Sequence, residues 1–299
     1  MPIPECAPAR PVSRRPLRRL PAGAVDCHFH VFGPESRFPF APGRSYTPPD
    51  ASIADYETLA GTLGFSRAVI VQPSVYGLDN RRTLSFLRES SIPARAVLVL
   101  DPDISDRELE ALHESGVRGV RVNLVFAAGL ALEAASTLAD KIRGLGWHLQ
   151  FLADVSRIEN LKEIVASLDI PVVFDHLGHV PAGKGVGDEG FQTLLSFVRD
   201  ARAWVKLTGA YRVTGMQTPP YGDVAPFVEA LVEAGPSQLV SGTDWPHPSI
   251  PVSMPDDTDL IDMFANWVSD ESLRQRIFVE NPERLYGFPA WGNECRSVK

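Results

Sequence analysis

The feature that most constrains the fold is a series of eight short apolar runs rich in β-branched residues, most of them followed by a segment of helical period. The runs occupy residues 24–33, 67–74, 95–101, 119–124, 147–154, 171–178, 203–211 and 238–246. Strands that alternate with helices indicate parallel βα units, and eight such units are the number that closes a (β/α)8 barrel. The sequence therefore predicts a single α/β domain of the TIM-barrel type.

Signals for helix ends agree with this pattern. Ser105 and Glu108 form a capping-box pattern ahead of a helix predicted over 105–115, and Gly116 stands at its stop position. A last helical pair is predicted within 256–287. Other helices are predicted to begin near Ser52, Asp79, Leu132, Ser156, Phe191 and Val224. The alternative of an open doubly wound sheet requires a glycine-rich phosphate turn after the first strand, which Phe32-Gly33-Pro34-Glu35 does not provide.

The first twenty residues differ from the rest of the chain because they hold five arginines among several prolines. No apolar stretch follows the Arg14-Arg15 pair, as an export signal would require. We predict a disordered or surface-wrapping arm over 1–20 and a barrel domain over 21–299, without an internal linker. The proline-rich loop over 34–49 has the length of a lid or pocket wall.

Composition excludes several classes of protein. The net charge of -8 argues against a nucleic-acid partner, and no run approaches the roughly 18 apolar residues of a membrane span. The three cysteines are scattered and odd in number, which is not a disulfide framework and indicates a cytoplasmic location. A cytoplasmic enzyme is therefore expected, and whether it forms a homo-oligomer is left open.

In a (β/α)8 barrel the chemistry lies at the carboxyl ends of the strands. His28 and His30 end the first predicted strand and share one face of it, His176 ends the sixth, and Asp244 ends the eighth. Three of the seven histidines thus fall at strand ends together with a carboxylate that could act as a base toward water. His113 and His148 lie elsewhere and are interpreted as structural.

Several stretches identify a family resemblance. VDCHFHVFGP at 25–34, VFDHLG at 173–178 and GTDWPHP at 242–248 resemble the amidohydrolase superfamily. From about residue 21 to 286 the chain is similar to the group of 2-pyrone-4,6-dicarboxylate lactonases and related sulfomuconolactone and sugar-acid lactone enzymes. The resemblance implies a barrel that hydrolyses a small anionic lactone from aromatic or sugar-acid catabolism.

By the same resemblance, Asp244 corresponds to the general base, and His28, His30 and His176 to the imidazoles around the substrate carbonyl. The residues that match contacts to the substrate's acidic groups are Arg121, Arg212, Ser74 and Tyr46, and Asn123 is also predicted to bind substrate. Apart from the resemblance, a place in the pocket lining and a structural role fit equally well for Tyr76, Asn80, Lys206, Tyr211, His179 and His247. A guanidinium offers a planar fork of donors that suits carboxylate or sulfonate oxygens.

Two departures from the lactonase pattern affect the substrate. Residues 124–128 read LVFAA where the lactonase continues with basic residues, and Leu152 stands where it has an aromatic hydroxyl. Both changes predict a substrate with fewer or differently placed acidic groups.

The use of a metal is left open by the sequence. Arg121 and Asn123 on the fourth strand argue against a binuclear site, because an arginine repels a dication. His28, His30, His176 and Asp244 could hold a single zinc, and a metal-independent mechanism fits equally well. The alternatives to hydrolysis are a lactone isomerase, a metal-dependent amidohydrolase or decarboxylase of the same superfamily, and a non-catalytic sensor.

Overall fold

The computed structural model describes residues 3–123, 125 and 133–292, and it confirms the predicted (β/α)8 barrel. Eight parallel strands pair in the order of the sequence. Backbone hydrogen bonds from Cys27 to Ser241 and from His30 to Trp245 join the first strand to the segment of the eighth. The strands are β1 (Val25–Phe29), β2 (Arg67–Val71), β3 (Ala94–Leu98), β4 (Val117–Asn123), β5 (His148–Leu152), β6 (Val172–Phe174), β7 (Ala203–Lys206) and β8 (Leu239–Val240).

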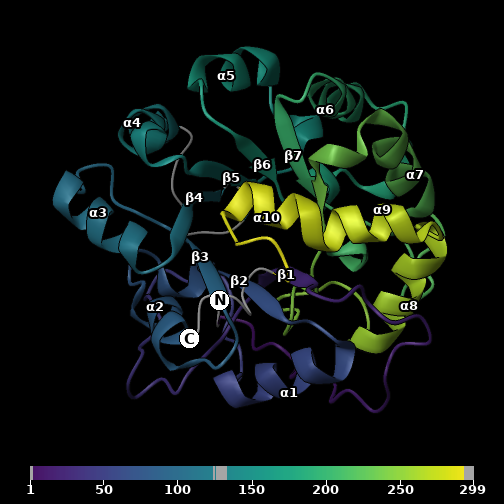
Figure 1. Ribbon diagram of the computed structural model, residues 1–299, viewed down its shortest axis with the longest axis horizontal. Coiled ribbons are helices and arrows are strands. Elements are labelled where there is room, and N and C mark those ends of the chain that lie inside the picture. Colours follow the sequence, from purple (N-terminus) through teal and green to yellow (C-terminus); the bar gives the residue numbers. More distant parts are fainter. Residues whose placement is uncertain (1–2, 124, 126–132, 293–299) are drawn as a thin grey trace.

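Helices surround the strands on the outside (Figure 1). They are α1 (Ile53–Leu63), α2 (Arg81–Glu89), α3 (Asp106–Glu114), α4 (Glu133–Ile142), α5 (Leu161–Leu168), α6 (Glu189–Arg199), α7 (Ala225–Ala234) and α8 (Asp257–Trp267). The capping box of Ser105 and Glu108 is present at α3. The helix expected near Ser156 begins later, because Asp154 accepts a hydrogen bond from the Ser156 amide and caps a 3-10 turn there.

A second helical run closes one end of the barrel (Figure 1). It consists of α9 (Glu271–Gln275), a π-helical turn (Arg276–Glu280) and α10 (Asn281–Tyr286). The buried ring of Tyr286 lies 5.4 Å from the ring of His148, which begins β5. Arg67 and Arg95, on β2 and β3, donate hydrogen bonds to carbonyls that follow α10. The amino-terminal end of the barrel is thus filled, which leaves the opposite end for chemistry.

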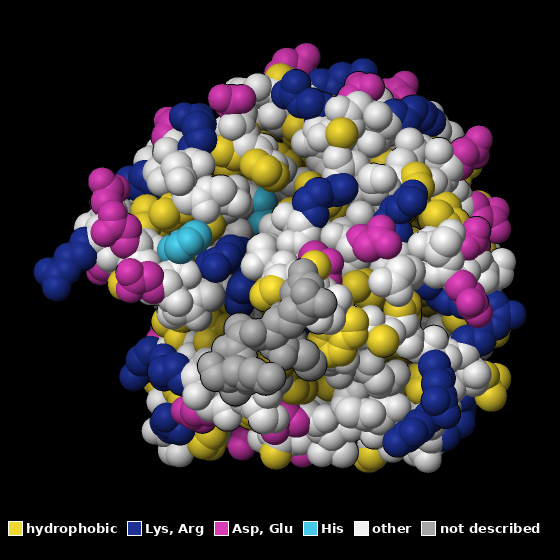
Figure 2. All heavy atoms as spheres, in the orientation of Figure 1, with side chains coloured by type: hydrophobic (Ala, Val, Ile, Leu, Met, Phe, Trp, Pro, Cys, Tyr) yellow, Lys and Arg dark blue, Asp and Glu magenta, His cyan; other side chains and the backbone are white. Residues whose placement is uncertain are grey.

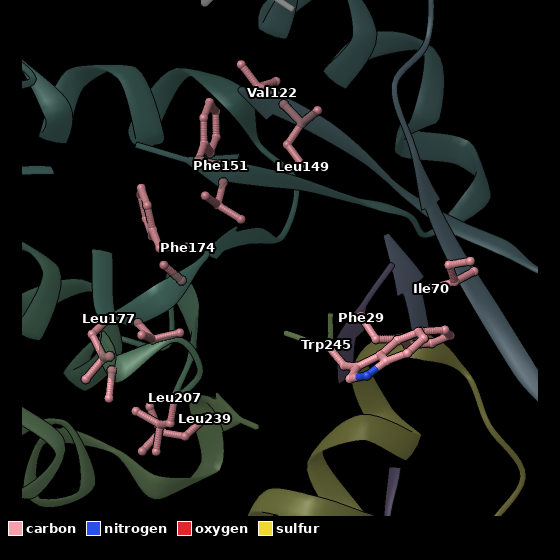
Figure 3. Packing of buried hydrophobic residues seen from close by; sticks show 14 of the residues in the cluster. Phe29, Ile70, Val122, Leu149, Phe151, Phe174, Leu177, Leu207, Leu239 and Trp245 are labelled. Atoms are coloured by element: carbon pink, nitrogen blue, oxygen red, sulfur yellow. The ribbon is translucent and has the colours of Figure 1, made fainter. Parts of the chain in front are cut away.

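The main core lies between the strands and the helices. The ring of Phe29 stacks on Tyr56 of α1 at 3.6 Å, and Figure 3 shows it beside Trp245. The register of β1 shifts between Asp26 and Phe29, so strict alternation is broken there. From His28 to His30 the side chains alternate as the sequence predicts: Phe29 packs toward α1, whereas the histidine on each side of it contacts residues at the barrel axis.

The surface carries charges of both signs. Figure 2 shows Lys and Arg side chains interspersed with Asp and Glu around one face of the molecule. Within the described residues, no helix is both long enough and apolar enough to cross a membrane.

Candidate active site

The structure brings together the four residues that the strand ends predicted as catalytic. The Nε2 atoms of His28 and His30 lie 3.8 and 3.6 Å from Asp244 Oδ1, and Nε2 of His176 lies 3.8 Å from Asp244 Oδ2. All four residues are buried. Three imidazole nitrogens therefore converge on one carboxylate at the carboxyl end of the barrel.

The backbone is unusual at two of these residues. His176 has φ +49° and Asp244 has φ +61°, both in the left-handed region that side chains with a Cβ rarely adopt. Such strain persists where the surrounding structure holds it, and it clusters at functional sites. Gly209 leaves room for the site, since a Cβ there would lie 2.6 Å from Nδ1 of His176.

The two oxygens of Asp244 have different surroundings. Oδ2 accepts hydrogen bonds from Arg212 Nε at 2.5 Å and from the Tyr211 hydroxyl at 2.7 Å. Oδ1 is buried and has no hydrogen-bond partner in the part of the chain that the structure describes. Burial raises the pKa of Asp244, but Arg212 and His176 outweigh it and hold the pKa well below its ordinary value. Asp244 is thus ionised, with Oδ1 available.

The hydrogen bond of His30 determines which of its ring nitrogens carries a proton. Nδ1 lies 2.7 Å from the backbone carbonyl of Val71, which can only accept, so Nδ1 is the donor. Burial lowers the pKa of His30 and favours the neutral ring, whose Nε2 then holds a lone pair. That lone pair faces the anionic Oδ1 of Asp244.

This arrangement fits a bound cation. Nε2 of His30 and Oδ1 of Asp244 are both electron-rich, and a cation or a proton between them relieves their repulsion. His28, His176 and Asp244 each offer a ligand atom, and these atoms lie within 4.8 Å of one another; His30 is outside this group. Imidazole and carboxylate are ligands that zinc prefers, and ligands on one zinc lie about 3.3 Å apart. Among the described residues this is the one such group found.

Asp175, which directly follows β6, links the cluster to two buried cations. Its Oδ1 lies 3.2 Å from Nδ1 of His28 and 3.7 Å from Nζ of Lys206, and its Oδ2 accepts a hydrogen bond from Arg121 at 3.1 Å. Burial raises the pKa of Asp175, yet His28, Lys206 and Arg121 together hold it well below its ordinary value. Burial lowers the pKa of Lys206 to about 8. Sequence reasoning assigned no role to Asp175, although its place at a strand end was a signal for one.

The two arginines predicted to bind substrate are each paired with a buried carboxylate. Arg212 is bound to Asp244 and donates through Nη2 to the Pro248 carbonyl, while Arg121 is bound to Asp175 and the Gln72 carbonyl.

Two further predicted contacts lie together. The Ser74 hydroxyl lies 3.5 Å from that of Tyr46, and burial raises the pKa of Tyr46 to about 12. This phenol therefore remains a donor at neutral pH.

Asn123 ends β4 and accepts a hydrogen bond from the Val125 amide; the rest of the 124–128 departure lies outside the described residues. Leu152 is buried at the end of β5.

The buried imidazoles predict how stability depends on pH. Burial lowers the pKa of His28 and of His148 to about 3, from an ordinary value of 6.5 in the unfolded chain. Below pH 6.5 unfolding therefore takes up protons, and the folded state loses stability as the pH falls. Burial raises the pKa of Asp26 from 3.8 to about 6, which acts in the opposite direction. Two histidines outweigh one aspartate, so the free energy of unfolding is expected to fall from pH 6.5 toward pH 4.

Urea denaturation in the presence of a chelator measures this dependence without a contribution from metal loss. His148→Gln removes one of these two imidazoles, the one that lies at the end of the barrel away from the cluster. The fall in the free energy of unfolding is expected to be shallower in this variant. A fall equally steep in that variant would contradict the assignment.

Comparisons with known proteins identify the family. Residues 25–288 match the amidohydrolase family, and the chain belongs to that family. It is 40% identical over 283 residues to a 2-pyrone-4,6-dicarboxylate hydrolase of Comamonas testosteroni, with 91% of this chain and 92% of that protein covered. It is 37% identical to a 4-sulfomuconolactone hydrolase of Rhizobium radiobacter, with 95% and 97% covered. A crystal structure of an Agrobacterium tumefaciens protein superposes with a TM-score of 0.82 at 28% identity, covering 92% of this chain and 99% of that one.

Proposed function

We propose that this protein is a cytoplasmic hydrolase that opens the lactone ring of a small carboxylated or sulfonated substrate by attack of water. The observation that carries the proposal is the buried Asp244, whose Oδ1 faces the Nε2 atoms of His28 and His30. The two relatives above are named for hydrolysis of 2-pyrone-4,6-dicarboxylate and of 4-sulfomuconolactone. A carboxylate base beside a carbonyl-polarising cluster is what such a reaction requires.

In the proposed mechanism Arg121 and Arg212 orient the acidic substrate. Asp244 takes a proton from water at Oδ1 as the water oxygen bonds to the lactone carbonyl carbon. The bond between that carbon and the ring oxygen then breaks, and Asp244 returns the proton to the leaving oxygen. Arg212 and Tyr211 hold Oδ2 and keep the carboxylate in place throughout.

We further propose that His28, His176 and Asp244, with His30 beside them, hold a single zinc ion. When bound, the metal would polarise the substrate carbonyl and acidify water. Elemental analysis of the purified protein is expected to find about one zinc per chain, and activity is expected to be lost on chelation and regained with zinc. Full activity in metal-free protein would instead assign the polarising role to the imidazoles alone.

Turnover of a lactone panel tests the proposed activity itself. Zinc-loaded protein is assayed with 2-pyrone-4,6-dicarboxylate, 4-sulfomuconolactone, a sugar-acid lactone and a neutral lactone, and ring opening is followed by absorbance or by acid release. At least one anionic lactone is expected to turn over faster than the neutral one. Absence of turnover across the panel would contradict the proposal.

Replacement of Arg121 tests the anionic nature of the substrate. Arg121→Met removes a buried guanidinium and is expected to lower kcat/KM for a carboxylated lactone by about tenfold or more, with little effect on a neutral lactone. Arg118→Met is a matched control, since Arg118 is on the same strand but donates to the carbonyls of His113 and Val117. Equal losses on both substrates in Arg121→Met would refute the role of an anion anchor.

A further inference from the structure

Residues 4–7 of the N-terminal arm contact two segments that carry predicted pocket residues, Tyr46 and His247. The Cys6 amide donates to the Thr47 carbonyl at 2.9 Å, and the Thr47 amide donates to the Pro4 carbonyl at 2.8 Å. On its other side, the Ser249 amide donates to Cys6 Sγ at 3.3 Å. The arm is therefore held between the segment that carries Tyr46 and the loop that follows His247.

A second set of contacts fixes the arm further along the chain. Both terminal nitrogens of Arg14 lie 2.6 Å from carboxylates of α8, those of Asp259 and Asp262. The Leu17 amide donates to Asp262, and the Thr258 hydroxyl donates to the Arg14 carbonyl. These bonds hold residues 14–17 independently of residues 4–7.

A cavity of about 220 Å³ lies against residues 4–7 of the arm. Tyr46 and His247 also line it, and Nδ1 of His247 lies 2.7 Å from the Tyr211 hydroxyl that donates to Asp244. Burial raises the pKa of the Cys6 thiol, while the Ser249 amide and the nearby Arg212 lower it. The cavity against the arm is thus connected to Asp244 through the contacts of His247 and Tyr211.

The lining of this cavity combines an apolar wall with a single charged side chain. Its far wall consists of Ile250, Val252 and Met254. No lysine or arginine is among the described residues that line it, and Glu5 is the one carboxylate. An acidic group placed here would meet the charge of Glu5 and no cation among the lining residues themselves.

We propose that residues 4–7 of the arm form an outer wall of the substrate pocket and select lactones that carry one acidic group and an apolar substituent. This inference rests on the proposed function for the reaction that follows binding. The preference for one ligand over another is a property of binding and can be measured without turnover. It agrees with the departures from the lactonase pattern at 124–128 and Leu152.

Two ligand pairs test the selection. The first pair is 4-propyl-2-pyrone-6-carboxylate and 2-pyrone-4,6-dicarboxylate, compared by kcat/KM. The second is 3-propylbenzoate and benzene-1,3-dicarboxylate, which cannot be hydrolysed and are compared by Kd from calorimetry. The wild-type protein is expected to prefer the propyl compound in each pair. Preference for the dicarboxylate in both pairs would overturn the proposal.

Changes to the arm are expected to shift this preference. Glu5→Lys should move the ratio of kcat/KM and of Kd toward the dicarboxylate by about fivefold to tenfold. Deletion of residues 2–8, which retains the Arg14 anchor, should weaken the preference for the propyl compound. Glu35→Lys is the matched control, because Glu35 is an exposed glutamate that does not line the cavity. Unchanged ratios in both arm variants would refute the proposal. A wild-type protein that binds the benzoates selectively but hydrolyses no lactone would refute only the proposed function.

Discussion

Asp244→Asn is expected to lower kcat by about a thousandfold or more, because the amide cannot take a proton from water. The substitution keeps the shape of the side chain and leaves an acceptor for Arg212 and Tyr211, which bind Oδ2 at 2.5 and 2.7 Å. Near-ultraviolet circular dichroism is expected to match that of the wild-type protein. KM should change far less than kcat, since the loss is one of transition-state stabilisation.

Tyr211→Phe provides a control within the same cluster. It removes one donor to Oδ2 of Asp244 and leaves Oδ1 untouched, so a loss of no more than about tenfold is expected. A near-normal rate in Asp244→Asn would remove Asp244 from the mechanism. If kcat fell as far in Tyr211→Phe as in Asp244→Asn, the loss in both variants would reflect a disturbed geometry of the cluster rather than the loss of proton transfer.

Asp175→Ala is expected to lower the free energy of unfolding by about 3–5 kcal/mol and to abolish most activity. It leaves Arg121 and Lys206 buried without their common carboxylate. It also removes the acceptor 3.2 Å from Nδ1 of His28, so that ring is no longer held with Nε2 toward Asp244. Urea denaturation measures the first effect and steady-state kinetics the second.

A double variant separates the two effects. Asp175→Ala combined with Lys206→Met removes one of the two stranded cations, so part of the lost stability is expected to return. Activity should stay low, because His28 still lacks its carboxylate. If stability losses in the two single variants simply add, the two side chains do not form a coupled pair. If activity returns together with stability, the role of Asp175 is confined to folding.

The fold was accessible from the sequence because strand and helix periodicity is a local property. Each predicted strand overlaps an observed one; β3 and β4 begin one and two residues before their predicted starts, and every observed strand ends earlier than predicted. Beyond Phe174 and Val240 the chain leaves the sheet and places His176 and Asp244 in left-handed turns. The register shift within β1 was also not predictable, because it is a property of the pairing with β2 and leaves no local signal in the sequence.

The candidate catalytic cluster could be predicted for the same reason, since all four residues stand at or just beyond strand ends. Ion pairs between side chains of distant strands could not be predicted from the sequence. Arg121 and Arg212 were predicted to contact substrate, and the structure pairs them with Asp175 and Asp244. Which carboxylate lies next to which guanidinium is set by barrel register and by burial, and neither leaves a local signal in the sequence.

The central claim is that water, activated by Asp244, opens the ring. Turnover of an accepted lactone in water enriched in ¹⁸O, followed by mass spectrometry of the product, tests it most directly. The account predicts one ¹⁸O atom per product molecule, in the newly formed carboxylate, and almost no incorporation with Asp244→Asn. A product that contains no ¹⁸O and has the mass of the substrate would show intramolecular isomerisation and contradict hydrolysis.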